Sequence, residues 1–207
     1  MMTPNRLSAK FFFDTDVSVK AADLIPVFHD WISRQAVEET LIDVADYSHV
    51  HQGPALMLVA LEADYVLDEG SGASGIRYIR KRTQPDSLAS ALALVVAQAA
   101  QAGHLIASSG LTSGVTLDTS QVEIEMLDKL HFPDELRKSE ALENALQEVG
   151  LVAFGDAGLT VEYVEQDQRR PLKLLLKNTS RTSLQEVSQR LKQSALLSSV
   201  YEAEVVG

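Results

Sequence analysis

The stretch from Ser87 to Leu117 contains no Asp, Glu, Lys or Arg, although 23% of the 207 residues are charged. Its apolar part, Leu88 to Ala107, consists mainly of alanine and leucine and has no charged face. A helix that is apolar on every side must be buried, in a protein core or in a membrane. A membrane span needs about 20 strongly apolar residues. This segment is interrupted by Ser90, Gln98, Gln101, Gly103 and His104. We therefore predict a buried core helix and no membrane partner.

Hydrophobic periodicity divides the rest of the chain into two similar halves. Helical spacing of apolar residues also occurs at 21–36, 136–149 and 184–195. Strand patterns occur at 10–14, 40–50, 55–67, 76–82, 115–127, 159–166, 172–177 and 200–206, and the pattern at 115–127 has a break near Thr119 and Ser120. Both halves follow the order β-α-β-β-α-β, the first with one extra strand, which is the order of the ferredoxin-like fold. We predict an α+β protein of two tandem ferredoxin-like units with antiparallel sheets, at residues 1–118 and 119–207.

Composition excludes several kinds of chemistry. The chain has no cysteine, so thiolate catalysis, zinc–thiolate sites, iron–sulfur clusters and disulfides are ruled out. The net charge of −11 disfavours a nucleic-acid partner, since phosphate binding requires concentrated Lys and Arg. The N-terminal residues lack the apolar core and cleavage site of a signal peptide. Together with the absence of cysteine, this favours a cytoplasmic protein.

A glycine-rich segment and a basic run follow each other in the first half. Gly70–Gly75 matches G-x-G-x-x-G, but a strand follows it instead of the helix that a dinucleotide site needs, so we interpret it as a hairpin loop. Arg77, Arg80, Lys81 and Arg82 form the densest cationic run of the chain. Charges of this kind can protect an edge strand from aggregation. The alternative is an anion-binding site beside the loop, with Arg77, Arg80 and Arg82 as its ligand-binding residues.

Two histidines and two carboxylates form the candidate metal site. His49 and His51 are two residues apart and would point to the same face of a strand. Glu62 and Asp64 lie on the next predicted strand, after a turn near Pro54. Two imidazoles and a carboxylate can bind Fe(II), Zn(II) or Mn(II) with positions open for a substrate. The alternative is that the histidines are surface residues at a strand end and the carboxylates lie on an exposed face.

The segment LIDVADYSHVHQGPALMLVALEADYVLDEG, residues 41–70, and the GIRYIRKR that follows it resemble a bacterial family of uncharacterised proteins. In the second half, LDKLHFPDE and VEQDQRRPLKLLL are similar to other blocks of that family. The resemblance covers most of the chain and implies a bacterial cytosolic protein. It implies no activity, ligand or site residue.

These observations favour a non-enzymatic binding or interaction protein, with a protein partner or a second copy of itself as the expected partner. The sequence contains no G-x-S-x-G, H-E-x-x-H, S-x-x-K or Walker A motif. It requires no cofactor, although a divalent metal remains open. The alternative is a metal-dependent enzyme or metal-binding protein that uses the His/carboxylate cluster, because carboxylate sites leave weak traces in a sequence.

Overall fold

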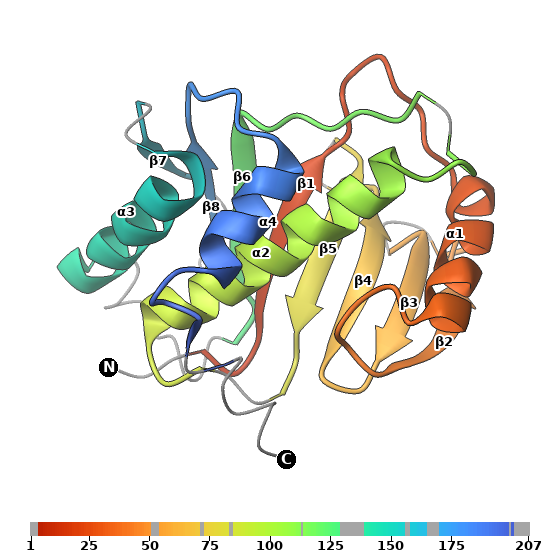
Figure 1. The fold of residues 1–207 in the computed structure, drawn as a ribbon, viewed down its shortest axis with the longest axis horizontal. Helices are drawn as coiled ribbons and strands as arrows, with labels where there is room; N and C mark the ends of the chain where they lie inside the picture. Colours follow the sequence, from red (N-terminus) through yellow and green to blue (C-terminus); the bar gives the residue numbers. More distant parts are fainter. Residues whose placement is uncertain are drawn as a thin grey trace.

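The computed structural model describes residues 4–50, 54–70, 73–82, 85–112, 114–128, 139–155, 158–164, 170–198 and 200. Within these residues the chain forms eight strands and four helices (Figure 1). In chain order they are β1 (Leu7–Phe12), α1 (Ala21–Arg34), β2 (Leu41–Asp46), β3 (Leu56–Ala60), β4 (Ala63–Asp68), β5 (Gly75–Arg80), α2 (Leu88–Ala107), β6 (Gln121–Met126), α3 (Glu140–Phe154), β7 (Thr160–Tyr163), β8 (Leu172–Lys177) and α4 (Leu184–Lys192).

The eight strands form one antiparallel sheet, in the order β2-β3-β4-β5-β1-β6-β8-β7. The predicted α+β class is therefore confirmed, but the two halves do not have a sheet each. β1 of the first half pairs directly with β6 of the second, with Leu7 opposite Met126. This pairing satisfies the backbone N–H and C=O groups that two separate sheets would leave at their edges. The side-chain pattern of a strand does not reveal which strand lies beside it.

One predicted strand is in fact two. The apolar run at 55–67 reads as continuous, but the chain turns at Leu61 and Glu62, between β3 and β4. Val59 of β3 then lies opposite Asp64 of β4. Leu61 is 43% exposed, as expected of a residue in a turn instead of a strand. At the C-terminus, residues 201–206 of the last predicted strand lie outside the described residues.

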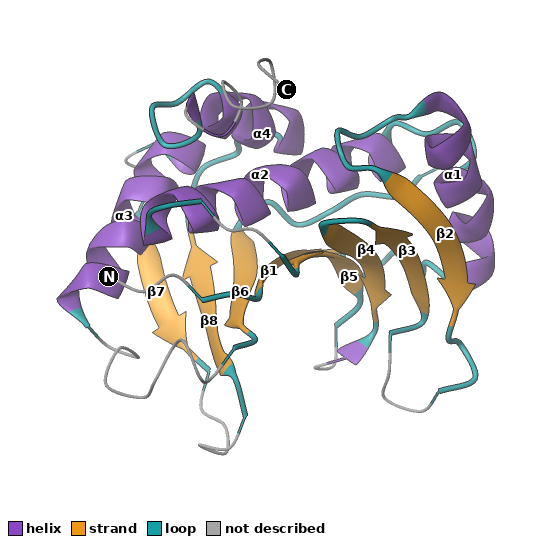
Figure 2. Cartoon of the chain, turned by 90° about the horizontal axis from the view of Figure 1, so that it is seen from below, coloured by secondary structure: helices purple, strands orange, loops and turns teal. Residues whose placement is uncertain are grey.

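The helices cover one face of the sheet (Figure 2). α2 packs against β1 and β5, α3 and α4 pack against α2 and each other, and α1 packs against β2 and β3. Strand side chains that point toward this layer, such as Leu7, Ala9 and Phe11, belong to the hydrophobic core. The other face of the sheet carries no helix and is concave (Figure 2). It is the face on which the polar side chains of the central strands lie.

α2 is the core helix that the charge-free stretch predicts. The Ser87 hydroxyl caps its start by accepting a hydrogen bond from the Ser90 N–H at 3.0 Å. Leu92, Val95 and Val96 are fully buried. The helix is long and apolar enough to cross a membrane by length and composition, but 72% of its most apolar window is buried inside the protein. Packing between the sheet and two other helices thus explains why it lacks a charged face.

Candidate functional site

Six charged side chains gather on the concave face of the sheet, on five neighbouring strands. They are three cations and three carboxylates: Lys10, Arg77, Lys173, Asp68, Glu123 and Glu125. We call this set the charged cluster. Strand pairing brings its members together, because Lys10 of β1 lies opposite Arg77 of β5 on one side and Glu123 of β6 on the other. The pleat alternates these residues with core residues that point to the helices.

Arg77 is the centre of the charged cluster. Its Nε donates to Asp68 Oδ2 at 2.8 Å, and Nη2 donates to Glu123 Oε1 at 2.5 Å. Nη1 donates to the Ser8 hydroxyl at 2.9 Å and to Glu125 Oε2 at 3.1 Å. The side chain is only 7% exposed and that of Glu123 only 4%. One guanidinium thus joins β1, β4, β5 and β6 through charge-assisted hydrogen bonds, which are stronger than neutral ones.

Lys10 fixes the connection between β4 and β5. It is fully buried, and its Nζ donates to Asp68 Oδ2 at 3.2 Å, to the Gly70 carbonyl at 3.2 Å and to the Ala73 carbonyl at 2.7 Å. The ammonium also lies 5.1 Å from the centre of the Phe12 ring, a cation–π distance. Gly75 leaves room for the Lys10 side chain, because a Cβ at this position would lie 2.9 Å from Lys10 Cε and 2.3 Å from the Phe11 carbonyl oxygen.

Charges in the cluster compensate one another. Burial alone would raise the pKa of Asp68, but the nearby Arg77 and Lys10 cations outweigh it and lower that pKa below its usual value. Burial lowers the pKa of Lys10, and the Asp68 carboxylate opposes this effect. Each of the six side chains has at least one ion-pair partner of opposite charge. The cluster is therefore a neutral, mutually bonded group of charges and not an isolated acid or base.

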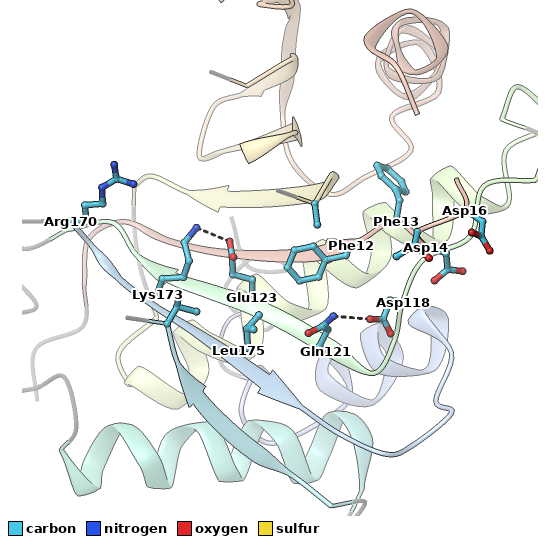
Figure 3. Close-up of a pocket in the computed structure, with 13 residues that line it drawn as sticks. Phe12, Phe13, Asp14, Asp16, Asp118, Gln121, Glu123, Arg170, Lys173 and Leu175 are labelled. Carbon is cyan, nitrogen blue, oxygen red and sulfur yellow. Dashed lines mark hydrogen bonds and ion pairs between the residues drawn. The ribbon is translucent and has the colours of Figure 1, made fainter. Parts of the chain in front are cut away.

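A hollow of about 820 Å³ lies beside the charged cluster on the same face (Figure 3). Glu123, Lys173 and Leu175 line it from β6 and β8, and Phe12 lines it from β1. Arg170 and Lys173 lie at one end, and Phe12 lies between them and a group of carboxylates at the other end (Figure 3). These carboxylates are Asp14, Asp16 and Asp118. The hollow opens to solvent and has the size of sites that bind small ligands or short segments of chain.

The carboxylates at that end of the hollow differ in how they are held. Asp118 Oδ1 accepts the Ser120 N–H at 2.8 Å, and Oδ2 accepts the Gln121 amide at 2.9 Å, so Asp118 fixes the start of β6. Asp14 and Asp16 follow β1, where the Asp14 N–H donates to the Thr116 carbonyl at 3.1 Å. Among the described residues, neither of their carboxylates has a hydrogen-bond or ion-pair partner. Asp14 and Asp16 are thus the side chains here that can bind a positively charged group.

The residues of the predicted metal site lie at two ends of β3. His49 is exposed, in the connection that follows β2, near the first residue of β3. Glu62 lies in the turn at the other end of β3, 3.9 Å from Arg80. Asp64 is the second residue of β4 and accepts a hydrogen bond from Lys81 Nζ at 2.7 Å. His49 is therefore not brought together with these carboxylates, and His51 lies outside the described residues. Within the described part of the chain, no group of three or more His, Asp or Glu side chains could hold a metal ion.

The predicted anion-binding arginines are also separated. Arg77 and Arg80 are three residues apart on β5 and point to opposite faces of the sheet, Arg77 into the charged cluster. Arg80 lies on the helix-covered face and donates to Glu39 at 3.1 Å, and Arg82 is exposed beyond the end of β5. β5 is an interior strand between β4 and β1, so its charges do not protect an edge. The pairing of Arg77 with three carboxylates explains why it tolerates burial.

No family model, no curated protein and no solved structure matches this chain.

The sequence contains one usable signal for the charged cluster. In Gln121–Met126 the apolar residues alternate strictly with polar ones, which places Glu123 and Glu125 together on the face opposite Val122 and Ile124. Lys173 follows the same rule in β8. The interior position of these strands in a single sheet has no such signal, and it is this position that buries their charges.

Proposed function

We propose that this protein is a binding protein that holds a ligand in the hollow on the concave face of its sheet and performs no chemistry on it. The hollow itself is the observation that carries this proposal: it has the volume of a ligand site, an aromatic ring at its middle and charged side chains at its ends. Such a combination of an apolar surface with a few polar groups is typical of specific binding sites.

The charged cluster supports binding over catalysis. A catalytic acid or base needs a group that gains or loses a proton near neutral pH. Here the lowered pKa of Asp68 keeps this carboxylate ionised, and the carboxylates around Arg77 keep its guanidinium charged. The three cations and three carboxylates are bonded to one another and form a rigid floor next to the hollow. A rigid floor reduces the entropy lost when a ligand binds.

A thermal-shift screen tests this function. A library of small acids, amines, nucleotides and short peptides is added to the wild type and to Leu175→Trp, which fills the hollow from the half-buried Leu175. Val59→Trp is the matched control, since Val59 is half-buried on the same face in β3 but does not line the hollow. We expect at least one class of compound to raise the Tm of the wild type and of Val59→Trp, but not of Leu175→Trp.

Mass spectrometry of the compound after incubation completes the test. We expect it to be recovered unchanged, as a ligand that is bound without reaction would be. If no compound distinguishes the wild type from Leu175→Trp, the hollow is not a binding site. If the compound is converted by the wild type and not by Leu175→Trp, the protein is an enzyme and the proposal is wrong.

We further propose that each half of the chain is a modified ferredoxin-like unit. In the second half, β8 lies between β6 and β7, the two strands that α3 connects, and this is the split βαβ arrangement. In the first half, β5 lies between β1 and β4, with β2 and β3 added beyond β4. This relation concerns the fold alone, because ferredoxin-like units have many unrelated functions.

A further inference from the structure

The two ends of the hollow differ in charge, and the strand register gives the distance between them. At one end Arg170 and Lys173 accompany a single carboxylate, Glu123, which lies 3.3 Å from Lys173. The other end carries Asp14, Asp16 and Asp118. Lys173 lies opposite Glu125, and Glu125 lies opposite Ser8 of β1, so Lys173 is level with Ser8 across the sheet. Asp14 follows six residues later, and the strand-like pairing continues to it through Phe13 and Leu117. At about 3.3 Å per residue the two charged ends are about 20 Å apart.

Between these ends apolar side chains line part of the hollow. The Phe12 ring lies at the middle of the hollow, and Leu175 and Val164 line it from the side of β8 and β7. An apolar group of the ligand can cover these side chains, while the charged ends fix its direction.

We propose that the ligand is an extended segment of another polypeptide, with an acidic side chain at the Arg170 and Lys173 end and a basic side chain at the Asp14 and Asp16 end. This inference rests on the proposed function and identifies the class of ligand. Six extended residues span about 20 Å, which matches the spacing of the charged ends. The segment crosses the face of the sheet and is recognised by its side chains, because β1, β6 and β8 beneath it are interior strands and have no free edge for added-strand pairing.

Other classes of ligand fit this charge pattern less well. A nucleotide or polyphosphate would place negative charge along the hollow, and Asp14, Asp16 and Asp118 would repel it at one end. A polyamine would meet Arg170 and Lys173 at the other end. A single amino acid has both charges, but it is too short to reach the two ends.

Isothermal titration calorimetry with synthetic peptides tests the inference. The first peptide has eight residues and blocked termini, with two aspartates at one end, two lysines at the other and leucine and serine between them. The second has the same composition with the charged residues alternating, and the third has lysine at all four charged positions. We expect the first peptide to bind the wild type at least 10-fold more tightly than either of the others.

Two variants locate the binding. Leu175→Trp should abolish binding of the first peptide, and Asp14→Asn/Asp16→Asn should weaken it at least 5-fold. The matched control is Glu143→Gln/Glu148→Gln, which removes the same charge from exposed positions on α3 and should leave the affinity within 2-fold. Equal weakening by both double variants would mean nonspecific attraction to an acidic protein and would overturn the inference.

The remaining outcomes separate this inference from the proposed function. Equal affinity for the first two peptides overturns the inference, because the separation of charge then has no effect. If no peptide binds, but a small compound of the thermal-shift library is excluded by Leu175→Trp, the peptide inference is wrong and the binding function stands. If neither the peptides nor any compound of the library binds, both are wrong.

Discussion

Replacing Arg77 by methionine tests how much the charged cluster contributes to stability. Methionine has an unbranched side chain and leaves the strand pattern of β5 unchanged, but it removes all the guanidinium contacts. Asp68 and Glu123 would each keep one other cation, Lys10 and Lys173 respectively. Removing one partner of a buried ion pair costs about 3–5 kcal/mol, because the remaining charge is left uncompensated. Because Lys10 and Lys173 remain, we expect the free energy of unfolding to fall by an amount at the lower end of this range, about 3 kcal/mol.

Urea unfolding followed by circular dichroism measures this loss. With a slope of about 2–3 kcal/mol per molar urea, the midpoint should fall by about 1–1.5 M.

The pH dependence of stability provides a second test. In Arg77→Met, Asp68 loses one of the two cations that lower its pKa, so that pKa rises and the folded state binds a proton more readily. The difference in free energy of unfolding between the wild type and Arg77→Met should therefore decrease as the pH falls from about 7 to about 5.

Arg82→Met is the matched control for Arg77→Met. Arg82 is exposed, so its replacement should change the free energy of unfolding by less than about 0.5 kcal/mol. If Arg77→Met costs less than about 1 kcal/mol, or if its deficit stays constant with pH, the cluster is not a buried network of compensating charges.

Three further predictions concern the core, the first residue of β5 and acid stability. Leu92→Ala should cost about 2–5 kcal/mol in urea unfolding, because Leu92 is fully buried; Leu111→Ala, at a position that is 57% exposed, should cost less than about 0.5 kcal/mol. Gly75→Ala should cost about 1–3 kcal/mol, because its Cβ would lie 2.3 Å from the Phe11 carbonyl oxygen; an unchanged melting temperature would contradict this geometry. The lowered pKa of Asp68 stabilises the fold above the unfolded pKa of about 3.9, and this contribution is lost as the pH falls through the folded pKa. Asp68→Asn should therefore lose less stability than the wild type between about pH 5 and pH 3, and equal losses would show that Asp68 is not the titrating group.

Local patterns predict most of the elements of this fold. Helical spacing locates α1 and α4. Ser183 and Glu186 form a capping box at the start of α4, with the Glu186 N–H donating to the Ser183 hydroxyl at 3.3 Å. The alternation of polar and apolar residues identifies β6 and the start of β8. Pairing between the halves was not predictable, because β1 and β6 are joined by backbone hydrogen bonds that any two strands can form. The turn at Leu61 and Glu62 was missed because it contains neither Gly nor Pro, the residues that most strongly mark turns.

The candidate site was harder to predict than the fold. His49 and His51 attract attention because histidine is a common metal ligand, yet His49 lies in an exposed connection. Lys10 is surrounded in sequence by apolar residues and has no motif, although it is fully buried and binds three acceptors. Its importance follows from the position of β1 between β5 and β6. The sequence specifies which face a side chain points to, while the order of the strands determines which charges meet there.

The presence of buried charges on this face, where apolar side chains could lie, supports a binding function. Replacing a buried ion network by apolar residues is often neutral or stabilising, so stability alone does not explain the charged cluster. An apolar concave face would attract a further layer of helix or another molecule without specificity. Balanced charges keep this face wettable, and the bonds of Arg77 and Lys10 hold its strands in place. The adjacent hollow can then stay open in the free protein and exchange water for a ligand with complementary charges.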